Sequence, residues 1–224
     1  VIPTDTISIS IDKDAVLRSG IMLPDSIRHL KGKELKNAIP DKIYISLKDM
    51  RILTKVDMLM LEMLANCNWE RPLYMAISVG EVSKLKFDHY FVQEGLAFRF
   101  TPFDYKKWGN VKGDNNYAID VERLYENVMN RYKYGGLDTP GLYLDETTLR
   151  TCYYHRRLFA QLAKELIRQG DNTRARKVLA YAEQAVPAYN VPEIYESGSF
   201  DIAKAYAALG EKTKAMPLLK NLTA

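Results

Sequence analysis

The densest group of polar side chains in the sequence lies in the segment 66–72, which reads Asn-Cys-Asn-Trp-Glu-Arg-Pro. A tryptophan ring offers a stacking face, while amide, carboxylate and guanidinium groups form directional hydrogen bonds. This combination predicts a subsite for carbohydrate or peptide. The alternative is a structural turn at the end of a helix, with Asn66 or Asn68 in the left-handed conformation and Pro72 opening a strand. The binding residues that we predict here are Asn66, Asn68, Trp69, Glu70 and Arg71.

A second polar group combines Glu94 with Arg99 on the strand predicted to follow it. Their opposite charges predict a structural ion pair, and a buried pair of this kind fixes register more often than it catalyses. Glu94 and Arg99 complete the predicted set of binding residues.

Histidine, the usual acid, base or metal ligand, occurs three times, as His29, His89 and His155, and none has a second ligand at helical metal-site spacing. Asp88 directly precedes His89, a position from which a carboxylate orients an imidazole poorly. The nucleophile-elbow, zinc-protease and phosphate-loop motifs are missing from the sequence. We therefore expect no catalytic residue, no metal and no cofactor in this segment, and an autonomous enzyme is not indicated.

Composition narrows the class of protein further. The 224 residues include 32 Lys and Arg against 28 Asp and Glu, a net charge of +4 that falls short of the basic face of a nucleic-acid binder. An apolar content of 47% suits one large or two small globular domains. No apolar run reaches the roughly 18 residues that span a bilayer. The chain opens Val1-Ile2-Pro3 without an initiator Met, so we expect a fragment of a longer protein.

The first elements that must position these groups are two strands and a helix. The segments 6–11 and 42–47 alternate polar and apolar residues, which predicts half-buried strands, the first at a sheet edge. Thr54 and Asp57 have capping-box spacing before the apolar run 56–65, which predicts a helix of about three turns with its methionines in the core.

Further strands and loops follow this helix. The continuous apolar run 72–78 predicts a strand buried on both faces, and a helix lying between strands suggests a βαβ unit. The segment 87–95 is expected to be a short helix or turn, and 96–100 a strand. The polar segment 108–116 is predicted to be an exposed loop. Asp120 is expected to cap a packing helix.

The remainder of the chain contains an internal repeat. Gly170 and Gly210 each end an apolar-periodic helix, 210 − 170 = 40 residues apart. Each is followed by an acidic residue and, five positions on, by an alanine small enough for two helices to approach closely. The pattern matches tetratricopeptide helical hairpins, with Pro217 tolerable only in the first turn of the last helix.

Three motifs in order carry a family resemblance. Trp69 to Ala76 resembles a W-x-R-P-[IL]-Y-[FM]-A signature, and Tyr90 to Arg99 resembles Y-F-x-x-E-G-L-A-Y-R. Residues 134–138 and 143–146 are similar to W-G-G-L-D and Y-L-D-E. These motifs resemble domain-of-unknown-function family 2723, bacterial membrane proteins similar to protein O-mannosyltransferases.

This resemblance implies a soluble, extracytoplasmic (periplasmic) region of an integral inner-membrane protein of the GT-C glycosyltransferase type, which uses lipid-linked sugars. The catalytic acidic residue of such proteins would lie in the membrane part, so none is carried over. The expected function is a non-catalytic accessory domain that binds acceptor protein or glycan or braces its own membrane part. The alternative is a protein-interaction scaffold acting through the tetratricopeptide surface.

We therefore predict an α/β fold, a small mixed sheet with flanking helices, over residues 1–142. An all-α tetratricopeptide-like domain is predicted over residues 143–224.

Overall fold

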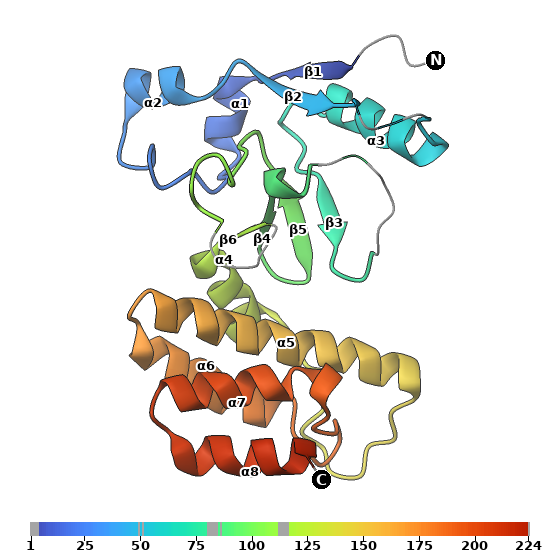
Figure 1. Ribbon diagram of the computed structural model, residues 1–224, viewed down its shortest axis with the longest axis vertical. Helices are drawn as coiled ribbons and strands as arrows, with labels where there is room; N and C mark the ends of the chain where they lie inside the picture. The colour runs from blue at the N-terminus through green and yellow to red at the C-terminus, as the bar shows by residue number, and fades with distance from the viewer. Residues whose placement is uncertain are drawn as a thin grey trace. The chain divides into compact units, whose positions relative to one another are not determined.

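The computed structural model describes residues 5–48, 50, 52–79, 85, 87–111 and 117–223 (Figure 1). Its contacts divide the chain into two compact units, Val1–Asp120 and Val121–Ala224. The first is mixed α/β and the second is helical, which confirms the predicted fold class. The division falls before the boundary that we placed after residue 142, so the segment from Val121 onward joins the helical unit.

The first unit contains short elements arranged in two sheets. Its helices and strands are, in chain order, β1 (Thr6–Ser10), α1 (Lys13–Arg18), α2 (Gly32–Ala38), β2 (Lys42–Ser46), α3 (Lys55–Asn66), β3 (Tyr74–Ala76), a 3₁₀ turn (Asp88–Tyr90), β4 (Phe91–Gln93), β5 (Ala97–Phe100) and β6 (Ala118–Ile119). β1 pairs with β2, and the second sheet has the order β3-β5-β4-β6.

The two-stranded sheet follows directly from the alternating sequence. β1 and β2 are antiparallel, with Ser8 opposite Tyr44. Ile9, Ile43 and Ile45 point into the core, while Ser8 and Tyr44 face outward. Alternation of this kind buries one face of a strand and leaves the other solvated. Both predicted strands are thus confirmed.

Helix α3 begins as the sequence predicts but packs differently. Thr54 and Asp57 form the predicted capping box, with the Thr54 N–H donating to Asp57 at 2.8 Å. The helix buries Leu61 and Leu64, whereas Met58 and Met63 are 60% and 50% exposed. The expectation that the methionines belong to the core is wrong for Met58 and Met63, whereas Met60 is partly buried and packs against the core.

The second sheet corrects two expectations. Within the described residues β3 pairs with β5 alone, so the strand predicted to be buried on both faces lies at a sheet edge there, and Tyr74 and Ala76 on it are exposed. β2 and β3, on either side of α3, belong to different sheets, so no βαβ unit forms. A continuous apolar run fits a buried strand and an edge strand equally well when it is short. The segment predicted as a helix or turn forms the 3₁₀ turn and then β4. Part of the predicted exposed loop, residues 112–116, lies outside the described residues.

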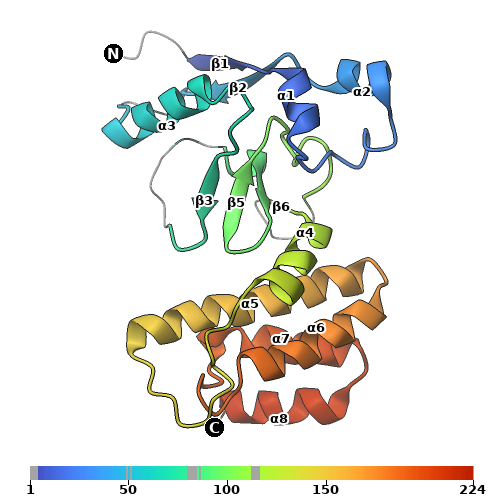
Figure 2. The same ribbon diagram turned by 180° about the vertical axis from the view of Figure 1, so that it is seen from behind.

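Among its described residues, the second unit contains helices joined by turns and loops, and no strand (Figure 2). Its elements are α4 (Val121–Glu126), a π-helical segment (Asn127–Arg131), α5 (Glu146–Arg168), α6 (Asn172–Ala185), a 3₁₀ turn (Tyr195–Ser197), α7 (Ser199–Ala208) and α8 (Lys212–Thr223). Helix α4 is held to the start of α6 by Arg174, whose two terminal nitrogens donate to Glu122 at 2.7 and 2.8 Å. This ion pair and the packing of α4 on α5 explain why the helical unit begins at Val121.

The predicted repeat is present as two successive helical hairpins, α5–α6 and α7–α8. Gly170 and Gly210 both adopt the left-handed conformation, with φ of 83° and 79°. After each glycine the next N–H returns to a carbonyl in the last helical turn, from Asp171 to Leu166 and from Glu211 to Tyr206, at 2.9 Å in both. This is the geometry in which glycine most commonly ends a helix. Pro217 lies inside α8, beyond its first turn, so the expectation about its position is wrong.

Candidate functional site

The segment 66–72 forms a tight turn that links α3 to β3. Cys67 ends the helix, and Asn68 and Trp69 follow it with φ of 49° and 60°. Two consecutive non-glycine residues in the left-handed region cost roughly 1–2 kcal/mol each, so contacts elsewhere must hold them there. The structural alternative for Asn68 is confirmed.

Trp69 supplies these contacts from within the core. Trp69 is only 5% exposed, and its indole N–H donates to the Ser10 carbonyl at 2.8 Å. The ring stacks on Phe100 with centroids 5.9 Å apart and planes inclined by 21°. Trp69 therefore holds β1 against the turn and does not present the stacking face that we expected for a ligand.

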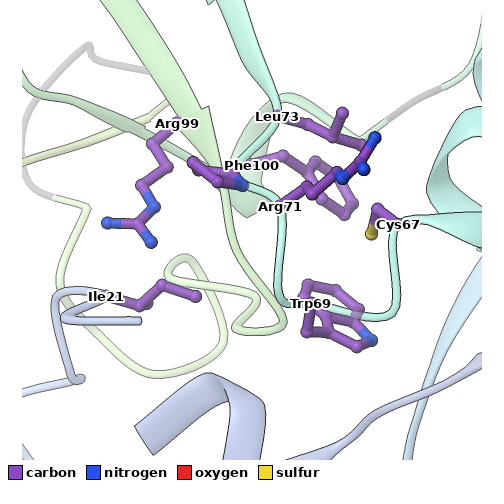
Figure 3. Close-up of a pocket in the computed structure, with 8 residues that line it drawn as sticks. Ile21, Cys67, Trp69, Arg71, Leu73, Arg99 and Phe100 are labelled. Carbon is purple, nitrogen blue, oxygen red and sulfur yellow. The ribbon is translucent and has the colours of Figure 1, made fainter. Parts of the chain in front are cut away.

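A small cavity lies beside this tryptophan. Figure 3 shows Arg99 on one side of it and Cys67 and Trp69 on the other, with Phe100 between them. Its volume is about 10 Å³. Such a space holds about one water molecule and is far too small for a sugar ring. The cavity is thus a feature of packing.

Glu94 and Arg99 form the predicted ion pair at the end of β4 and on β5. Both residues are buried, at 5% and 4% exposure, and Glu94 Oε1 lies 3.7 Å from Arg99 Nη1. Tyr74 donates its hydroxyl hydrogen to the other carboxylate oxygen at 2.8 Å, and Arg99 Nη2 donates to the Ser19 carbonyl at 2.8 Å. The pair ties β3, β5 and the end of α1 together, which is a positioning role.

An open groove of about 600 Å³ lies beside the predicted residues in the first unit. On one side it is lined by consecutive residues of β1 and its end, Ser8 to Asp12. On the other side lie Ala65 at the end of α3 and the turn residues 68–70. The structure thus brings Asn68, Trp69 and Glu70 to the same groove, although Trp69 is almost fully covered.

The wall that β1 contributes is its outer edge, which pairs with no other strand in the part of the chain that the structure describes. Residues that lie opposite each other on two antiparallel strands alternate along the strands between hydrogen-bonded and non-hydrogen-bonded pairs. Ile11 N–H donates to Asp41 O and Leu47 N–H to Asp5 O, so odd-numbered residues of β1 face β2. The N–H and C=O of Ser8 and Ser10 therefore point to the opposite edge, where the Ser10 carbonyl accepts the Trp69 indole hydrogen.

Of the other predicted residues, Asn66 and Arg71 do not line this groove, and Glu70 lines it but has a partner of its own. Asn66 donates its amide hydrogens to the backbone and side chain of Glu62 within α3, at 2.9 and 2.8 Å. Arg71 is exposed and lines the small cavity. Glu70 lies 3.8 Å from Arg18, in an exposed ion pair.

His89 has a partner that the sequence did not indicate. Its Nε2 lies 3.4 Å from Asp104, a carboxylate that also accepts from the Lys107 backbone at 3.1 Å. Asp104 therefore caps a turn, and the pair is structural. Among the described residues no group of three or more His, Cys, Asp and Glu side chains is arranged to hold a metal ion. Within the same residues, no helix combines the length and apolar character needed to cross a bilayer.

Sequence comparison adds the family to this geometry. Residues 1–122 match the model of TMEM260-associated domain 2, a domain linked to membrane glycosyltransferase-like proteins. The chain belongs to this family. The matched range ends close to the boundary between the two compact units, so the family domain is the first unit. No curated protein and no solved structure matches the chain.

Proposed function

We propose that the TMEM260-associated unit binds an extended polypeptide along the open edge of β1. The observation that carries this proposal is the groove of about 600 Å³ whose wall is that edge. An extended chain adds to such an edge through main-chain hydrogen bonds, and flanking pockets choose its side chains. Ser8 offers one N–H and one C=O for this purpose, because its register directs both away from β2.

The two edges of this small sheet differ in a way that supports β1 as the docking strand. On β2, the Tyr44 backbone interacts with the Tyr90 side chain at the end of the 3₁₀ turn, so part of that edge is covered. On β1, the Trp69 indole engages only the Ser10 carbonyl at the end of the strand. Backbone N–H and C=O groups that point away from their own sheet, as those of Ser8 do, attract a further strand.

The charges of the groove indicate which polypeptide it would take. Its lining contains two acidic residues, Asp12 and Glu70, and no basic one. Asp12 is occupied as the cap of α1, accepting from the Ala15 N–H at 2.9 Å. Glu70 at the rim lies 3.8 Å from Arg18, but both side chains are exposed, and a solvent-exposed ion pair is weak enough for a cation of the ligand to replace Arg18. A segment with a basic residue beside its extended stretch fits this rim.

Within a longer protein, this activity is that of a non-catalytic accessory domain. The family link to membrane glycosyltransferase-like proteins and the motifs that resemble those of family 2723 support an extracytoplasmic position and an acceptor polypeptide as the ligand. Catalysis would then belong to the membrane part, and the accessory unit would hold the acceptor near it.

Replacement of Ser8 by Pro tests the proposal directly. Proline removes the N–H that points into the groove but leaves the β1–β2 hydrogen bonds, because those use odd-numbered residues. The probe is a fluorescent peptide of about ten residues, near the upper limit of ordinary strands, with alternating Thr and Val and a lysine at each end. Loss of one backbone hydrogen bond, worth about 1 kcal/mol, together with the bulk of the ring predicts binding weakened about tenfold.

The matched control is Ser8→Thr, which keeps the N–H and the strand preference and should bind within about twofold of the parent. Far-ultraviolet circular dichroism verifies that both variants fold. If folded Ser8→Pro binds the peptide as tightly as the parent, or if the parent does not bind it at all, the edge is not a docking site and the proposal fails.

A further inference from the structure

The second unit contains an aromatic groove that the polypeptide proposal does not use. It lies between the segment 129–138 and α6, and its volume is about 530 Å³. Ligand sites for small molecules have volumes of roughly 300–1,000 Å³ and combine apolar walls with a few polar groups. The lining residues that carry the argument are Tyr134, Tyr181, Lys133, Asp138 and Gln184.

Tyr134 is fixed in position in this groove. Its hydroxyl donates to the Val128 carbonyl at 2.6 Å, and its ring lies 5.6 Å from Phe159, with the planes 30° apart. Tyr181 stands against it at 6.0 Å and 77°, edge to face. Burial raises the pKa of Tyr134, so it stays a neutral phenol. Two half-buried rings at nearly right angles form a rigid apolar corner.

The loop opposite α6 is fixed as well. Asn190 donates to the Leu137 and Thr139 carbonyls at 2.7 and 2.6 Å, and the Tyr189 hydroxyl donates to the Asp138 carbonyl at 2.7 Å. These three bonds hold the backbone that carries Asp138 at the rim. A groove with walls already in place loses little conformational entropy when a ligand enters.

Before this loop, the chain turns at Gly135 and Gly136, both left-handed with φ of 63° and 76°. A side chain at either position would be strained by this backbone, and a Cβ at Gly135 would meet no atom within 4 Å. The glycines therefore allow the turn, and the space around Gly135 stays open beside the Tyr134 ring.

The polar rim is balanced in charge, with Lys133 opposed by Asp138 and an amide from Gln184. All three side chains belong to exposed residues, so they reach a ligand in the groove. A strongly anionic or cationic ligand would meet a like charge there. A neutral polyol, which has an apolar C–H face and hydroxyls that both donate and accept, matches the aromatic corner and the rim together.

From this geometry we infer that the groove binds a neutral sugar residue, with its C–H face against the Tyr134–Tyr181 corner and its hydroxyls toward Lys133, Asp138 and Gln184. The site is separate from the β1 edge and lies entirely within the helical unit. The second unit would thus have a ligand of its own. If no sugar binds there, the proposal that the first unit binds a polypeptide is unaffected.

The test uses the full chain and saturation-transfer-difference NMR with neutral hexose disaccharides as probes. We expect transfer to the ring C–H protons of at least one disaccharide, with affinity near 1 mM, as for a small ligand held by few contacts. Tyr181→Ala removes one wall and should weaken binding at least tenfold. Gln184→Ala, a surface change that cannot unfold the hairpin, should weaken it about threefold.

The matched control is Tyr195→Ala, which removes a tyrosine that is 64% exposed and does not line the groove. It should leave sugar binding unchanged, as should Ser8→Pro in the first unit. The inference is overturned if folded protein shows no transfer from any of the disaccharides at 50 mM. It is overturned equally if Tyr181→Ala and Gln184→Ala bind as the parent does.

Discussion

Replacement of Trp69 by Ala separates a packing role from a ligand-binding role for this residue. Trp69 is only 5% exposed, its ring stacks on Phe100, and its indole N–H donates a hydrogen bond to the Ser10 carbonyl. Truncation of a buried Trp to Ala costs about 3–5 kcal/mol of unfolding free energy. Loss of the indole hydrogen bond is one part of this cost and contributes about 1 kcal/mol.

Trp69→Phe separates the part of this cost that comes from the hydrogen bond from the part that comes from packing of the ring. Phenylalanine keeps a ring against Phe100 and loses the indole N–H that reaches the Ser10 carbonyl. We expect a cost of about 1–2 kcal/mol, the hydrogen bond plus a small cavity. The difference between the two variants then measures the packing of the ring.

Urea unfolding gives both numbers from one reporter. The chain has two tryptophans, so in either variant Trp108 alone reports on the first unit by fluorescence, and circular dichroism follows the helices of the second. The reasoning is refuted if Trp69→Ala lowers the unfolding free energy by less than about 1 kcal/mol, because a buried indole cannot be removed so cheaply. A stable Trp69→Ala protein with lost ligand binding would restore the role of a stacking surface.

Two further predictions concern ionisable groups that are buried or partly buried. Arg99→Met removes the cation that lies 3.7 Å from buried Glu94 and should lower the free energy of unfolding in urea by about 3–5 kcal/mol. Adding Glu94→Gln to this variant should recover part of the loss, because the unpaired buried charge is then removed. Equal stability of the single and double variants would contradict the pairing. Burial lowers the pKa of His155, so near neutral pH and below it the folded state binds fewer protons than the unfolded state. The free energy of unfolding should therefore fall as the pH decreases below about 6.5, the pKa of histidine in the unfolded chain. His155→Phe, which keeps a ring near Tyr134, should lose less stability between pH 7.5 and pH 5, and an equal loss in both proteins would assign the acid sensitivity elsewhere.

Local signals in the sequence were sufficient for many elements. Alternation predicted β1 and β2, capping-box spacing predicted the start of α3, and the glycines at 170 and 210 predicted the ends of α5 and α7. Each depends on interactions within a few residues of the chain, so a single stretch of sequence contains all the information. The Glu94–Arg99 pair was predictable for the same reason, because a tight hairpin connects the two residues.

The candidate site was predictable only in part. The sequence placed polar groups at 66–72 and an edge strand at 6–11 but could not join them. The hydrogen bond from Trp69 to Ser10 joins residues far apart in the chain, and it also reverses the meaning of the tryptophan from exposed platform to buried anchor. Ser8 and Ser10, which the sequence alone did not mark as site residues, gain their role from strand register.

The sequence by itself therefore determined the mixed α/β and helical halves, the helix caps, the repeat and the family motifs, because these are written in local spacing. Only the tertiary structure decided which strand edge is open, which side of α3 is covered and where the aromatic rings of the second unit meet. Burial and pairing depend on chain segments distant in sequence, and the same apolar run or aromatic residue serves a core or a surface according to what packs against it.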